Sequence, residues 1–82
     1  MAFTSVSKTD KLLALNAAKA DFERELYKNL ARLGYDPDTY DTSSFTFDSS
    51  ASEEVDPDIK LKKQVANSIA RLNLVNQKIS DI

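Results

Sequence analysis

Residues 61–82 have the sequence LKKQVANSIARLNLVNQKISDI, in which apolar or small side chains return at alternating steps of four and three. This 3.5-residue repeat is typical of an α-helix that packs against another helix along its whole length. The segment contains neither glycine nor proline, so nothing in it interrupts a helix. The positions that form the repeat are Leu61, Val65, Ser68, Leu72, Val75, Ile79 and Ile82.

A start signal for this helix lies just before the repeat. Asp56 is a preferred capping residue, and Pro57 has the fixed φ angle favoured at the first helical position. Asp58 places a carboxylate near the positive end of the helix dipole. We therefore predict a helix over residues 56–82.

A second apolar stripe lies upstream and predicts a helix over residues 8–33. Ser7, with Asp10 three residues later, resembles a capping box at its start. Gly34 is the single glycine of the chain, and we expect it to end the helix in a left-handed conformation, with Tyr35 folding back as in a Schellman motif. The stripe consists of Leu12, Leu15, Ala18, Phe22, Leu26, Leu30 and Leu33.

Two helices of similar length predict an antiparallel hairpin, joined by a connector over residues 34–55. This connector is longer than the roughly two to eight residues usual between bundle helices, so we expect it to have structure of its own or a task. A single helical turn is expected near Pro37–Tyr40, whereas residues 42–47 alternate weakly, as in a short strand or an extended segment. Residues 1–7 are predicted to form a mobile N-terminal arm.

The connector combines negative charge with aromatic side chains. Residues 34–58 carry eight acids and no base, although the net charge of the whole chain is only −2. Two interpretations of the aromatics remain open and are compatible. They complete a small core over the open side of the hairpin, or they anchor the chain on a partner, with Phe45 and Phe47 adding to a sheet edge or filling pockets. The aromatics concerned are Tyr35, Tyr40, Phe45 and Phe47.

The composition argues against catalysis, cofactors and metal sites. The chain has no histidine, no cysteine and one glycine, so it lacks the commonest general base, the strongest common nucleophile and any glycine-rich phosphate loop. Asp36, Asp38 and Asp41 are closely spaced oxygen donors. An EF-hand loop starting at Asp36 requires glycine and then glutamate where the chain has Asp41 and Phe47, so the match fails. We predict no enzyme, no cofactor, no metal and no small-molecule substrate.

Hydropathy and the distribution of basic residues bear on localisation and on nucleic-acid binding. No signal peptide or membrane-spanning stretch is evident, which predicts a soluble intracellular protein or part of a particle assembled inside a cell. The basic side chains of the second helix are assigned to solvated surface on several faces, because no aromatic interleaves with them and the acidic connector repels phosphate. They are Lys60, Lys62, Lys63, Arg71 and Lys78.

These patterns together predict an all-α protein whose apolar helix surface exceeds what one hairpin can cover, so that oligomerisation or docking completes it. The predicted function is a non-catalytic structural or adaptor subunit of a larger assembly. By analogy at the level of the fold, such an assembly is a virus or phage particle. The alternative is a small acidic inhibitor or regulator that engages a basic site on a partner protein. The predicted partner contacts are Tyr40, Phe45, Phe47, Leu72, Val75 and Ile79.

Overall fold

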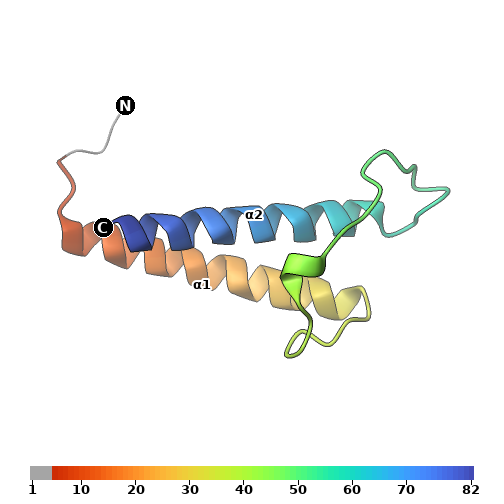
Figure 1. The fold of residues 1–82 in the computed structure, drawn as a ribbon, viewed down its shortest axis with the longest axis horizontal. Helices are drawn as coiled ribbons and strands as arrows, with labels where there is room; N and C mark the ends of the chain where they lie inside the picture. The colour runs from red at the N-terminus through yellow and green to blue at the C-terminus, as the bar shows by residue number, and fades with distance from the viewer. Residues whose placement is uncertain (1–4) are drawn as a thin grey trace.

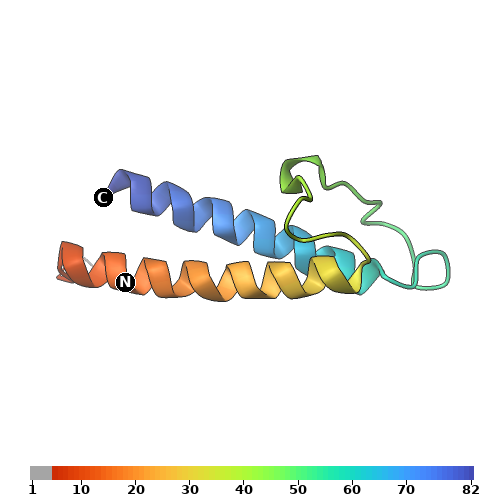
Figure 2. The same cartoon turned by 90° about the horizontal axis from the view of Figure 1, so that it is seen from below.

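Two long helices pack side by side in a computed structural model that describes residues 5–82. Helix α1 (Lys8–Arg32) is followed by the short 3₁₀ helix η1 (Thr42–Ser44) and by helix α2 (Ile59–Asp81). The helices run in opposite directions, so that the beginning of α1 and the end of α2 lie together at one end of the molecule (Figures 1 and 2). The predicted all-α helical hairpin is confirmed, and the described part of the chain contains no strand. Residues 1–4 of the predicted arm lie outside the described residues.

The ends of α1 follow the predicted signals. The Ser7 hydroxyl oxygen accepts a hydrogen bond from the backbone N–H of Asp10 at 3.1 Å, which satisfies one of the unpaired donors of the first turn. Gly34 has a φ angle of +90°, which glycine adopts without the steric cost of a side chain. Its N–H donates to the Ala31 carbonyl, and the Tyr35 N–H donates to the Leu30 carbonyl, both at 3.0 Å. These two bonds confirm the Schellman motif.

Helix α2 begins at Ile59, later than the predicted start at Asp56. The Ile59 N–H donates to the Asp56 carbonyl at 3.1 Å, which forms a tight turn before the first α-helical bond, from Lys62 N–H to the Asp58 carbonyl at 2.9 Å. The Asp56 carboxylate accepts the Asp58 N–H at 3.1 Å and pairs with the Lys62 ammonium at 2.7 Å. Asp56 therefore caps the turn that precedes the helix.

The connector forms turns both near Pro37 and at Thr42–Ser44. The turn near Pro37 is confirmed, because the Tyr40 N–H donates to the Asp36 carbonyl at 2.9 Å. The prediction of a short strand or extended segment over residues 42–47 is wrong for Thr42–Ser44, which form η1. The reason is local, since the Asp41 carboxylate accepts both the backbone N–H and the hydroxyl of Ser43, at 3.0 and 2.6 Å. Such side-chain bonds offer the backbone an alternative to extended pairing.

The buried core lies at the end of the hairpin where the connector crosses it. Leu26, Leu30 and Val65 form its centre, and Val65 is fully buried. The fully buried residues of α1 are confined to its last third, because the apolar stripe between Lys8 and Glu25 is at most half-buried. On α1 the core is therefore one-ended, whereas the buried residues of α2 extend from Ile59 to Val75. The half-buried residues that pack against its centre are Leu33, Tyr40, Phe45, Ile69 and Leu72.

Candidate docking site

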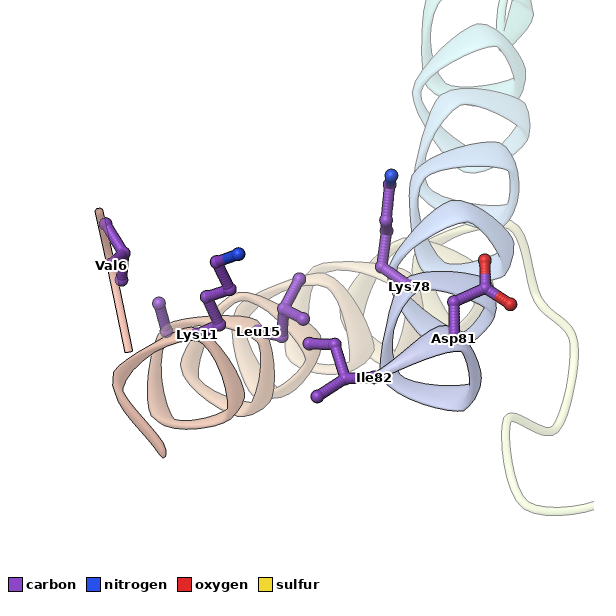
Figure 3. A pocket seen from close by; sticks show the side chains of 7 residues that line it. Val6, Lys11, Leu15, Lys78, Asp81 and Ile82 are labelled. Carbon is purple, nitrogen blue, oxygen red and sulfur yellow. The ribbon is translucent and has the colours of Figure 1, made fainter. Parts of the chain in front are cut away.

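The opposite end of the hairpin has an apolar groove that no part of the connector covers (Figures 1 and 3). It lies between the first turns of α1 and the last turn of α2 and has a volume of about 620 Å³. Figure 3 shows the Ile82 side chain directed toward Leu15 across the floor of the groove. We call this site the open-end groove. Its lining residues are Val6, Lys11, Ala14, Leu15, Lys78, Asp81 and Ile82.

The open-end groove exists because the apolar seam continues past the region that the connector covers. Leu12, Leu15, Ile79 and Ile82 are all half-buried, in contrast to the fully enclosed Val65 at the other end. A half-buried leucine or isoleucine leaves apolar surface in contact with water, and burying that surface stabilises a complex. The groove is therefore suited to an apolar knob.

The rim of the open-end groove carries excess positive charge. Lys11 and Lys78 stand on α1 and α2 respectively, and Asp81 is the one carboxylate among the lining residues. Figure 3 shows Asp81 directed away from Leu15 and Ile82, and its carboxylate accepts a hydrogen bond from the Gln77 amide at 3.0 Å. An occupant that combines an apolar side chain with a carboxylate would match this rim.

The connector presents an exposed apolar side chain at the far end of the molecule. Val55 is 80% exposed, more than any other large hydrophobic residue among residues 5–82. Its turn is compact, because the Ser52 carbonyl accepts the N–H groups of both Val55 and Asp56, at 3.1 and 2.9 Å. Glu53 pairs with Lys60 of α2 at 2.8 Å, and this lysine lowers the pKa of the Glu53 carboxyl. We call residues 52–56 the connector tip.

The six predicted contact residues do not form one exposed surface. Tyr40, Phe45 and Leu72 pack against the core of their own chain, and Val75 is only 8% exposed. Of the four connector aromatics, Tyr40 and Phe45 therefore take part in the core, as the first interpretation expected, whereas Tyr35 is exposed. Phe47 is half-buried and lies against Phe45, with ring centroids 5.7 Å apart. Ile79 is half-buried in the exposed part of the seam. Their role as partner contacts stays a prediction.

Sequence reasoning placed Leu15 and Ile82 in the helix seams but did not single them out as contacts. It also missed Val55. A signal for Val55 was present, because it is the only large apolar residue within the polar run from Ser49 to Asp58. A lone valine among serines and acids has no local partner to bury it, so exposure at a turn is the expected result.

Most carboxylates of the connector bond within the chain. Asp41 and Asp48 each accept backbone and hydroxyl groups of nearby serines, and these bonds lower the pKa of both carboxyls. Glu53 and Asp56 form ion pairs with Lys60 and Lys62. The acidic connector is thus tied to itself and to the beginning of α2. Glu54 at the connector tip forms no ion pair within residues 5–82.

Between Ser5 and Ile82, no three acidic side chains gather closely enough to hold a metal ion. In that range neither helix is long and apolar enough to cross a membrane. No protein family model matches the chain, and neither curated proteins nor solved structures gave a significant match. Function is therefore inferred from the geometry of the hairpin itself.

Proposed function

We propose that this chain is a non-catalytic structural or adaptor subunit of a larger macromolecular assembly, located inside a cell or in a particle assembled there. The observation that carries the proposal is the one-ended core. Helix α1 continues for 18 residues before its first buried residue, Leu26, and its stripe ends in the open-end groove. A partner that fills this groove buries apolar surface that the hairpin alone leaves in water.

The absence of histidine and cysteine from the sequence supports a binding role over catalysis. The groove supports it further, because its lining is apolar with charges only at the rim, as in protein interfaces that have an apolar centre and a polar edge. The predicted alternative, an acidic inhibitor, has less support. Such an inhibitor needs carboxylates that are available to a basic partner, and several connector carboxylates already accept bonds from their own chain.

The test compares native and altered chains in the cells that normally make the protein. Leu15→Glu places a charge on the groove floor, and Asn16→Glu places the same charge on the adjacent, exposed position as a matched control. Size separation of a gentle extract should find the native chain and the Asn16→Glu chain at masses far above 9.1 kDa. The Leu15→Glu chain should appear as the free protein, because burying a carboxylate in an apolar groove is costly. A native chain found only at its own mass, or equal distribution of all three chains, would refute the proposal.

A further inference from the structure

The two ends of the molecule carry apolar surface and opposite charges that complement each other. One end offers the open-end groove, which is apolar with Lys11 and Lys78 at its rim. The other end offers the connector tip, where exposed Val55 follows two glutamates. Figure 1 shows the start of α1 and the end of α2 at one end of the hairpin and the connector before α2 at the other. The longest dimension of the molecule is 48 Å. We propose that the connector tip of one copy inserts into the open-end groove of the next, so that copies of this chain join head to tail.

The connector tip has the properties of a preformed knob. Its two backbone hydrogen bonds to the Ser52 carbonyl and the ion pair between Glu53 and Lys60 fix the turn before any partner arrives. A segment that is already ordered loses less conformational entropy on binding than a flexible one. Val55 is exposed on this turn, and the half-buried Leu15 and Ile82 line the groove that receives it on the next copy.

Charge fixes the orientation of the contact. When Val55 enters the groove, the neighbouring carboxylate of Glu54 comes to a rim that carries Lys11 and Lys78. Asp81 is the opposing charge at that rim, but its side chain points away from the groove floor and is bonded to Gln77. One carboxylate then meets two ammonium groups. Ion pairs at such an exposed rim contribute mainly to specificity and association rate, and the buried valine contributes most of the affinity.

A contact between two different surfaces does not close on itself. Unlike a two-fold dimer, it repeats from copy to copy and gives either a ring or an open filament, depending on the rotation between neighbours. The spacing between neighbouring copies should not exceed the 48 Å length of the molecule, because the knob overlaps the groove. The inference rests on the proposed assembly role and specifies its partner as a second copy of this chain.

The experiment uses two purified variants that each disable one half of the contact. Val55→Asp disables the knob, and Leu15→Glu disables the groove. Sedimentation velocity over a concentration series should show that the native chain forms multimers, and that each variant alone remains a monomer, with association weakened by at least about tenfold. An equimolar mixture should give a dimer and nothing larger, because only one knob and one intact groove remain.

Two further variants serve as controls. Leu74→Asp makes the same change at another exposed apolar residue, one that lies outside both surfaces, and should leave multimers intact. Lys78→Glu should weaken association, and combining it with Glu54→Lys should restore it. Because Glu54 and Lys78 are exposed, replacing them should leave the fold intact, so the test remains valid even if Leu15→Glu lowers stability.

Several outcomes would overturn the inference. They are a native chain that stays monomeric at all concentrations, multimers that survive Val55→Asp, and a mixture of the two variants that does not dimerise. The groove could instead be filled by a segment of the same chain. In that case the native chain is a monomer and the Leu15→Glu variant has a lower melting temperature than the native chain, a result that also overturns the inference. None of these results alters the expected mass of the native complex in cells, so failure here is distinguishable from failure of the assembly role.

Discussion

Asn29 is a polar side chain that is completely buried between the helices. Its amide nitrogen donates to the Glu25 carboxylate at 3.3 Å, but its side-chain oxygen has no hydrogen-bond partner among the described residues. A buried acceptor without a partner costs stability, whereas leucine has the same branched shape without this cost. We predict that Asn29→Leu raises the free energy of unfolding by about 1 kcal/mol.

Urea unfolding followed by circular dichroism measures this change. Asn16→Leu is the control, since Asn16 is exposed and its replacement should alter stability by less than about 0.5 kcal/mol. A loss of stability in Asn29→Leu would contradict the prediction and would mean that the Asn29 oxygen is satisfied in solution.

The carboxyl of Asp56 gives the fold a defined pH dependence. The hydrogen-bonded ammonium of Lys62 lowers the pKa of Asp56 from its ordinary value of 3.8. Because the folded pKa lies below the unfolded one, this contribution is fully present above pH 3.8 and disappears as the pH falls through the folded pKa. Asp56→Asn should therefore lower stability at pH 7 and remove part of the loss seen on acidification. Urea unfolding midpoints of both chains at pH 7 and at a pH below 3.8 test this. An equal loss of stability on acidification in the native and Asp56→Asn chains would contradict the prediction.

Predictions from single residues were correct where the residue has one structural role. Gly34 is an example, because only glycine readily takes the left-handed conformation that ends α1. The start of α2 was predicted too early, at Asp56, because the Asp56 carboxylate accepts the Asp58 N–H and also pairs with the Lys62 ammonium. The ion pair with Lys62 cannot be predicted from a pattern that considers helix capping alone. Asp41 misled in the same way, since its bonds to Ser43 make a 3₁₀ turn from a segment that alternates like a strand.

Helix α1 has equivalent leucines with unequal environments. Leu15 and Leu30 both belong to its apolar stripe, but Leu30 is 2% exposed and Leu15 is half-buried. We predict that Leu30→Ala lowers the free energy of unfolding by about 3 kcal/mol, because it leaves a cavity under the connector. Leu15→Ala should cost about 1 kcal/mol or less, because little apolar contact is lost in the monomer.

Chemical denaturation at a concentration that keeps the chain monomeric compares the two variants directly. Equal losses would mean that the apolar seam is enclosed along its whole length. The difference could not be predicted from the sequence, since a heptad pattern records which face of a helix is apolar and not how far a connector reaches across it. The apolar stripes were enough to predict that the two helices pack together. They do not show where the connector stops covering the helices, so the one-ended core could not be predicted.

The molecule as a whole is a hairpin whose apolar surface is covered by the connector at one end and left uncovered at the other. The connector closes the core around Leu30 and Val65, while the open-end groove at the termini stays uncovered. Local stability should follow this division, because amides open more readily where few apolar contacts hold the helix. The division is also what makes assembly favourable, since an occupant of the groove stabilises only the folded state.

Native-state hydrogen exchange on the isolated, monomeric chain measures this division residue by residue. We predict that amides in the first three turns of α1 and the last turn of α2 exchange at least about a hundredfold faster than those of Leu26, Leu30 and Val65. Uniform protection along both helices of the monomer would contradict the account, because the open end would then be as well enclosed as the core.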